Sequence, residues 1–205
     1  MKSKLLFFLL MICFLADQYC IYNGLKEFRF FTKLSLVPLL LVHYIVSSQS
    51  KNILFVLGLI LSFFGDLFLL FEGGFLLGLG SFFLAHVFYV FSFKQFIKAH
   101  PTQLILLLGL YLIVLISVLF PYLNEMKIPV IFYGIIISTM LYCAAASKDK
   151  ILIIGALLFV ISDTILSLRL FMFKNVVLDL FVMLTYVAAQ YFLVKGMINK
   201  KVLHN

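Results

Sequence analysis

Long runs of apolar residues alternate with short polar connections along the whole chain. Eight runs have about the length at which an α-helix crosses a bilayer, and they cover residues 4–22, 30–48, 53–71, 74–94, 102–121, 128–146, 151–172 and 176–196. They are too long for the strands of a transmembrane barrel and lack the alternation of such strands. Only helices and closed barrels satisfy backbone polar groups in lipid, so the pattern predicts an all-α polytopic membrane bundle of about eight transmembrane helices.

The connections between these runs are short and hold most of the glycine, proline, asparagine and charge. No linker, low-complexity tract or appended polar segment separates them. We therefore expect residues 1–205 to form a single transmembrane helical domain.

The composition excludes an ordinary soluble domain. Hydrophobic residues make up 65% of the chain and charged residues 12%, whereas soluble domains average about 45–50% and about 25%. The mean hydropathy is +1.20. One soluble core could not bury this much apolar surface, so membrane lipids are the expected surroundings.

The net charge of +8 does not indicate nucleic-acid binding, because the basic residues gather at the ends of the apolar runs. Alternate connections place ten of them on one side (Lys2, Lys4, Lys51, Lys94, Lys98, Lys148, Lys150, Lys195, Lys200, Lys201) and six on the other (Lys26, Arg29, Lys33, Lys127, Arg169, Lys174). By the positive-inside rule this excess predicts both termini in the cytoplasm.

The first run resembles a signal peptide, because two lysines precede an apolar stretch. No Ala-x-Ala cleavage motif follows it, so we expect a retained helix. Short loops and lysine-rich helix ends suggest a bacterial cytoplasmic membrane, with the endoplasmic reticulum as the alternative.

Two aspartates interrupt the apolar runs in matching settings. Asp66 and Asp163 each follow a small residue, Gly65 or Ser162, and each lies eight positions after a glycine. A carboxylate inside a membrane span costs several kcal/mol, so it is rarely without a role. Two of them at the same depth of two similar helices predict one site built from both.

The shared spacing also suggests a parallel pseudo-repeat of four helices plus four, with the site between the halves near the midplane. The run that follows each aspartate carries two polar residues at one-turn spacing. These residues are His86 and Tyr89 after Asp66, and Tyr186 and Gln190 after Asp163. Such residues either line the site or only join helices by hydrogen bonds.

Other polar residues have two interpretations each. Lys33, with Arg29 one turn before it, either snorkels to the interface or binds a phosphate group. Tyr133 is a supporting residue of the site or an interface anchor. Three acids nearer the helix ends are expected to be solvated; they are Asp17, Glu72 and Asp179.

The sequence contains no recognisable metal or cofactor motif. Of the four histidines only His86 falls near the aspartates, and Cys13, Cys20 and Cys143 have no metal-ligand spacing. Gly-rich phosphate loops and the Gly-x-Ser-x-Gly elbow are absent. We expect neither a metal nor an organic cofactor.

Four motifs in register resemble the YhhN family, the lysoplasmalogenases, from Lys33 to Gly196. They are Gly65-Asp66, Phe75-x-x-Gly78 with Phe83-Leu84-Ala85-His86-x-x-Tyr89, Gly155 through Ser162-Asp163, and Thr185-Tyr186-x-x-x-Gln190. The chain departs from the family at Leu34, where proline is frequent, and in having no tryptophan. The resemblance implies hydrolysis of the vinyl ether bond of lysoplasmalogens, giving a fatty aldehyde and glycerophosphoethanolamine or glycerophosphocholine.

Paired carboxyl groups suit that ether-lipid chemistry. Vinyl ethers hydrolyse by protonation at carbon, which needs a protonated acid, and a second carboxylate can stabilise the resulting cation, as in glycosidases. Asp163 is favoured as the acid and Asp66 as the charged partner. His86, Tyr186 and Gln190 are expected to tune them by hydrogen bonds, with the phosphate of the lysophospholipid near Lys33 and Arg29.

Two other functions remain open at this point. A proton-coupled transporter of small molecules or lipids would also use two intramembrane aspartates in a pseudo-repeat. Such carriers usually have helices broken by proline or glycine at the site, and residues 53–71 and 151–172 contain no proline. A structural or assembly role in the membrane is the third interpretation.

Overall fold

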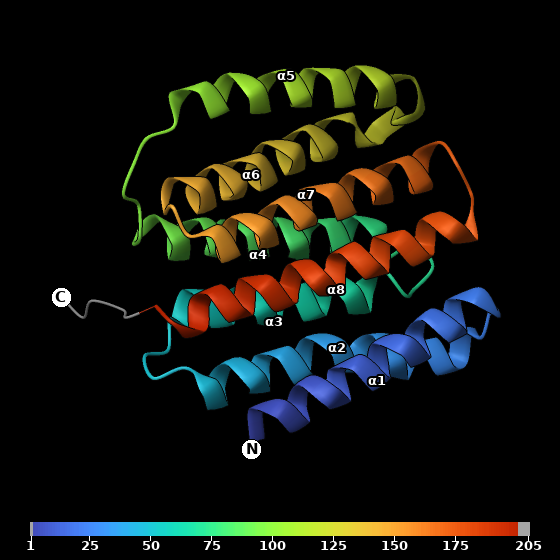
Figure 1. The fold of residues 1–205 in the computed structure, drawn as a ribbon. Helices are drawn as coiled ribbons and strands as arrows, with labels where there is room; N and C mark the ends of the chain where they lie inside the picture. The colour runs from blue at the N-terminus through green and yellow to red at the C-terminus, as the bar shows by residue number, and fades with distance from the viewer. Residues whose placement is uncertain (1, 201–205) are drawn as a thin grey trace.

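The computed structural model describes residues 2–200, and within them the chain forms a bundle of eight α-helices (Figure 1). The helices are α1 (Lys2–Tyr22), α2 (Lys26–Ser47), α3 (Ile53–Phe68), α4 (Phe75–Lys94), α5 (Thr102–Leu119), α6 (Lys127–Ala146), α7 (Lys150–Phe171) and α8 (Val176–Ile198). Two short 3-10 turns, η1 (Phe120–Tyr122) and η2 (Asn124–Met126), join α5 to α6. Each predicted run corresponds to one helix, so the all-α prediction is confirmed. Lys201 and His204 lie outside the described residues.

Seven of the eight helices are long and apolar enough to cross a membrane, and the protein is an integral membrane protein. The exception is α3, which has 16 residues and ends at Phe68 instead of the predicted 71. The chain turns directly after it, with Gly73 at a φ of +78°, a conformation that favours glycine. A side chain on Gly74 would overlap the Phe68 carbonyl. The glycine pair therefore ends this span early.

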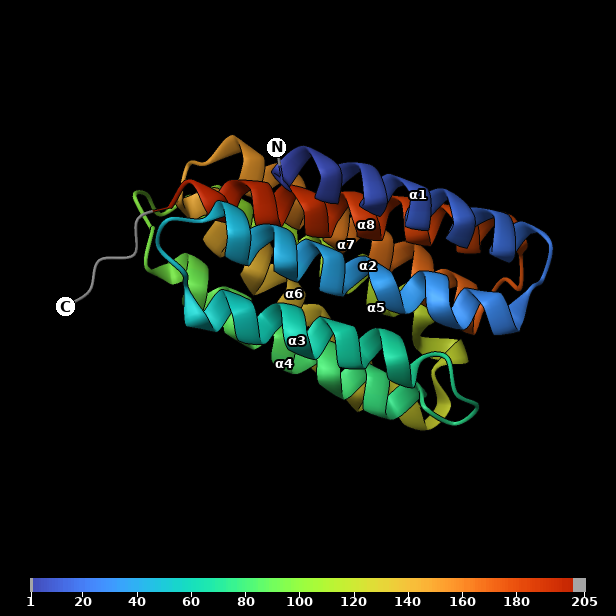
Figure 2. The ribbon, with the colours of Figure 1, turned by 90° about the horizontal axis from the view of Figure 1, so that it is seen from below.

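The helices run along one common direction, and both ends of the described chain lie at the same end of the bundle (Figures 1 and 2). The closest pairs are α3 with α4, α7 with α8 and α1 with α2. Two further pairs of contacts repeat between the halves: α2 packs on α3 and α8, while α6 packs on α7 and α4. This arrangement agrees with the suggested relation between α1–α4 and α5–α8.

The glycine that lies eight positions before each aspartate allows one close helix contact. A Cβ at Gly155 of α7 would lie 2.8 Å from the backbone nitrogen of Leu193 in α8. A Cβ at Gly58 of α3 would overlap the ring of Tyr89 in α4. Small residues let membrane helices approach this closely. The spacing noticed in the sequence thus marks where the aspartate-bearing helices meet their neighbours.

Gly155→Ala is expected to lower the free energy of unfolding by about 1–3 kcal/mol, because the added methyl meets backbone that cannot turn away. Gly80→Ala is the matched control, since a Cβ at Gly80 in α4 would meet nothing within 4 Å. Thermal unfolding in detergent measures both. Equal midpoints for the two variants would contradict the close contact of α7 with α8.

Candidate active site

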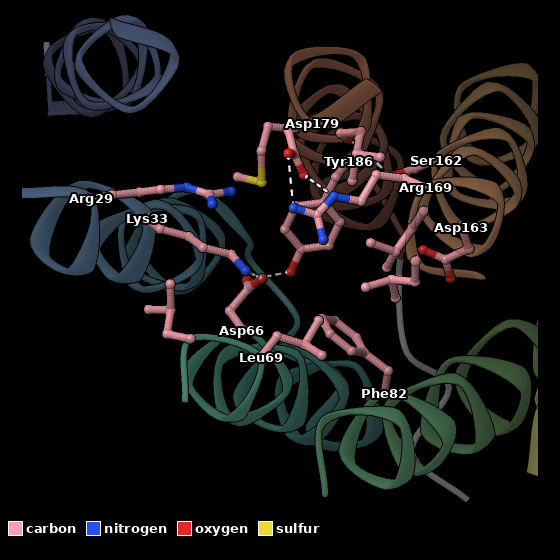
Figure 3. Close-up of a pocket in the computed structure, with 15 residues that line it drawn as sticks. Arg29, Lys33, Asp66, Leu69, Phe82, Ser162, Asp163, Arg169, Asp179 and Tyr186 are labelled. Atoms are coloured by element: carbon pink, nitrogen blue, oxygen red, sulfur yellow. Dashed lines mark hydrogen bonds and ion pairs between the residues drawn. The ribbon is translucent and has the colours of Figure 1, made fainter. Parts of the chain in front are cut away.

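A polar pocket of about 140 Å³ opens between α2, α3, α4, α7 and α8 (Figure 3). Both Asp66 and Asp163 line it, so the structure brings the two predicted aspartates into one cavity. Its charged walls comprise three cations and three carboxylates: Arg29, Lys33, Arg169, Asp66, Asp163 and Asp179. The pocket therefore combines carboxyl groups and cations in equal number.

Asp66 is held as an ion pair. Its side chain is almost completely buried, and the Nζ atom of Lys33 lies 3.2 Å from Oδ1. The hydroxyl of Tyr186 in α8 donates a hydrogen bond of 2.7 Å to Oδ2. A buried carboxylate needs such partners. Both groups favour the charged form of Asp66.

The buried position of Lys33 excludes one of its two interpretations. Only 6% of its surface is exposed, so the snorkelling interpretation is wrong. The contact of α2 with α3 and α8 directs this side chain inward to Asp66. Its role toward a phosphate group stays a prediction.

Asp163 lies on α7 in a less polar setting. The hydroxyl of Tyr133 in α6 donates a short hydrogen bond to its Oδ2. Among the described residues no cation pairs with this carboxyl group. Tyr133 thus contacts one of the aspartates directly, as Tyr186 contacts the other.

The two aspartates share the pocket without touching each other. Figure 3 shows Asp66 on α3 and Asp163 on α7 at opposite sides of the pocket, and each carboxyl group has its own tyrosine donor. The site also lies away from the midplane. Asp66 is two residues from the end of α3, because the turn that follows comes earlier than the sequence predicted.

His86 does not hydrogen-bond to either aspartate in the described structure, so that expectation is wrong. It is fully buried, and its Nδ1 atom bonds to the carbonyl of Phe82 at 2.6 Å. Its Nε2 atom has no partner among the described residues. The ring packs edge-on against Tyr133, with centroids 5.4 Å apart. His86 therefore contacts Tyr133, the hydrogen-bond partner of Asp163, and not the carboxyl group itself.

Gln190 and Tyr89 belong to a hydrogen-bond chain that ends at Asp66. Tyr89 donates to Oε1 of Gln190 at 3.0 Å and lies 3.3 Å from the hydroxyl of Ser62. Nε2 of Gln190 is 3.5 Å from the hydroxyl of Tyr186. These side chains orient Tyr186 and do not contact the carboxylate.

Ser162 lines the pocket beside Asp163, but its hydroxyl donates to the carbonyl of Val182 in α8 at 3.0 Å. This bond joins α7 to α8. Ser162 therefore has a structural contact at the site, and its hydroxyl is already engaged.

Two further ion pairs involve arginines that line the outer part of the pocket. Nε of Arg29 lies 3.8 Å from Oδ1 of Asp17, which is fully buried between α1 and α2. Arg169 contacts both carboxylate oxygens of Asp179, at 2.7 and 2.9 Å. The solvated setting expected for Asp17 is therefore wrong, whereas Asp179 is partly exposed and Glu72 is exposed.

Sequence reasoning missed Arg169 and Asp179 as pocket residues. A usable signal existed, because they flank the short turn between α7 and α8 at similar distances, and such positions face each other across a helical hairpin. Within residues 2–200 no three His, Cys, Asp or Glu side chains converge as metal ligands would.

Comparison with known proteins agrees with these motifs. The sequence profile of the YhhN family matches residues 28–197. A human protein, lysoplasmalogenase TMEM86B, is 35% identical over 135 residues, which cover 64% of this chain and 58% of the human one. The chain thus matches less than two thirds of that relative's length. No solved structure matches the chain.

Proposed function

The chain belongs to the YhhN family, and on that premise we propose that it is a membrane-embedded hydrolase of lysoplasmalogens. It would cleave their vinyl ether bond to release a fatty aldehyde and glycerophosphoethanolamine or glycerophosphocholine. The observation that carries the proposal is the unequal pair of carboxyl groups in one pocket. Asp66 has a lysine partner and Asp163 has none among the described residues.

This inequality supports a different role for each of the two carboxyl groups. A carboxyl group without a cation in a low-dielectric site favours its protonated form, whereas an ion-paired one favours its charged form. Asp163 would be the proton donor, and Asp66 would be the carboxylate that stabilises positive charge. Tyr133 donates to one oxygen of Asp163, which leaves the other oxygen to carry the proton.

The reaction then follows from vinyl ether chemistry. The proton of Asp163 is added to the vinyl carbon on the chain side, and the double bond becomes an oxocarbenium ion at the carbon bonded to oxygen. Water adds to that carbon and loses a proton to a carboxylate, giving a hemiacetal. Collapse of the hemiacetal breaks the carbon–oxygen bond and yields the aldehyde and the glycerol hydroxyl. No redox step occurs.

The cations of the pocket suit the phosphate of a lysophospholipid. Arg29 and Arg169 lie toward the outer part of the cavity, while Lys33 lies beside Asp66. A guanidinium group can bind two phosphate oxygens at once through two parallel hydrogen bonds. The phosphate would therefore lie near the arginines, with the vinyl ether deeper, between the two aspartates.

The same cations bear on the orientation in the membrane. Of the six basic residues on the side opposite the termini, Arg29, Lys33 and Arg169 line the pocket. The other three basic residues on that side are Lys26, Lys127 and Lys174. We place both termini in the cytoplasm of a bacterial inner membrane, with the pocket opening at the other face.

Aldehyde release by the purified protein tests the proposal. A 1-alkenyl lysophosphoethanolamine should yield aldehyde, and its saturated 1-alkyl ether analogue should not, because only a vinyl ether is protonated at carbon. If no vinyl ether lysophospholipid yields aldehyde, whatever its headgroup, the proposed function is wrong. Proton-driven uptake into liposomes would then favour a carrier.

A further inference from the structure

An apolar slot adjoins the polar pocket and shares part of its wall. It encloses about 50 Å³ and is lined by residues of α4, α6 and α7 and by Leu69. Five residues line both cavities: Leu69, Phe82, Asp163, Leu166 and Leu170. Asp163 is the one charged side chain among the described residues of the slot wall. This carboxyl group thus stands where a polar cavity meets an apolar one.

Two ring contacts between the antiparallel helices α4 and α7 mark the length of the slot. At one end Phe75 meets Phe171, with centroids 5.6 Å apart. Deeper in the bundle His86 meets Phe159 at 4.7 Å. The slot lies between these pairs, and Leu79 of α4 lines it.

A small hydrophobic cluster closes the slot from behind. Val130 of α6 lines the slot and packs with Leu119 and Leu123, which are almost fully buried. The cluster comes from the end of α5, from Leu123 between the two 3-10 turns, and from α6. The α5–α6 connection therefore shapes an interior wall.

Other apolar hollows of the bundle differ from this slot. The groove around Gly109 and Thr139 is lined by α5 and α6 alone, and the one around Gln18 by α1 and α8 alone. Two-helix grooves are ordinary features of a lipid-facing surface. The slot instead involves three helices and opens onto a candidate catalytic carboxyl group.

We propose that this slot binds the alkenyl chain of the lysolipid where the chain leaves the vinyl ether, an inference that rests on the proposed function. The headgroup then lies in the polar pocket, and the vinyl carbons lie at Asp163. This orientation suits the chemistry, because the carbon that receives the proton is the one on the chain side of the ether. The narrow apolar slot admits hydrocarbon and excludes the charged headgroup.

Filling the slot should change the preference for chain length. Ser167→Phe and Val130→Phe add bulk from α7 and from α6, on different walls. Thr139→Phe is the matched control, because Thr139, like Ser167, bonds to a carbonyl of its own helix but lines the α5–α6 groove. The substrates are lysophosphoethanolamines with a 1-propenyl or a 1-hexadecenyl chain.

The ratio of kcat/KM for the long chain to that for the short chain is expected to fall at least about tenfold in both slot variants, since one misfitted methylene already costs about 10–200-fold. The control should keep the wild-type ratio. An active wild type whose slot variants also keep that ratio overturns the slot and leaves the proposed function standing. Absence of aldehyde from the wild type is the separate failure of the proposed function.

A labelling experiment covers the case in which a slot variant fails to fold or the wild type is inactive. A saturated hexadecyl ether lysophosphoethanolamine with a diazirine at the third chain carbon is photolysed with the wild-type protein. Mass spectrometry should locate the label within residues 75–86, 130–133 or 163–171. Labels confined to 105–112 and 135–142 would overturn the assignment.

Discussion

Aldehyde release from a lysoplasmalogen is expected to fall by about 10²–10⁴-fold in Asp163→Asn, the usual contribution of a general acid. Asparagine has nearly the same shape and can still accept the hydrogen bond from Tyr133. It carries no acidic proton to give to carbon. The measurement is kcat for aldehyde formation by purified protein in detergent, with the thermal midpoint as evidence of folding.

Asp149→Asn is the matched control on the same helix. Asp149 caps the start of α7 by accepting from the backbone N–H groups of Ile151 and Leu152, and it pairs with Lys200 at 2.6 Å. Asparagine is also a good N-cap, and this end of the bundle is remote from the pocket. The control should therefore keep wild-type kcat. A folded Asp163→Asn enzyme with wild-type kcat would remove Asp163 from the mechanism.

Lys33→Met should destabilise the protein by about 3–5 kcal/mol, because it removes one partner of a buried ion pair and leaves the other charge uncompensated. Both side chains of the Lys33–Asp66 pair are at least 92% buried, with exposed fractions of 8% and 4%. Unfolding in detergent with increasing denaturant measures the loss. Arg169→Met is the matched control and should cost less, because the Arg169–Asp179 pair is 33% and 20% exposed.

The double variant Lys33→Met/Asp66→Asn separates stability from chemistry. Removing the orphaned charge should restore most of the stability, while aldehyde release stays low because no carboxylate faces the cation. Recovery of activity in the double variant would refute the role proposed for Asp66. A stability loss in Lys33→Met no larger than in Arg169→Met would contradict the buried pair.

The positions of several side chains could not have been predicted from the sequence. Lys33 and Asp66 are 33 positions apart in the chain, and only the contact of α2 with α3 brings them within 3.2 Å. The sequence pattern predicts His86 near the aspartates, yet its Nδ1 atom bonds to the Phe82 carbonyl of its own helix. Helical periodicity gives the face of a residue but not the rotation of that face toward a neighbouring helix.

The sequence by itself determined the class of the protein, the number of its helices and the two aspartates of its pocket. These features depend on local hydrophobicity and on the cost of charge in lipid. Both act within each segment, independently of the other segments. The tertiary structure decided which aspartate has a cation, which tyrosine serves each, and where a polar pocket meets an apolar slot. Those features depend on how helices distant in sequence rotate and pack, and close contacts such as that of Gly155 with Leu193 fix that packing.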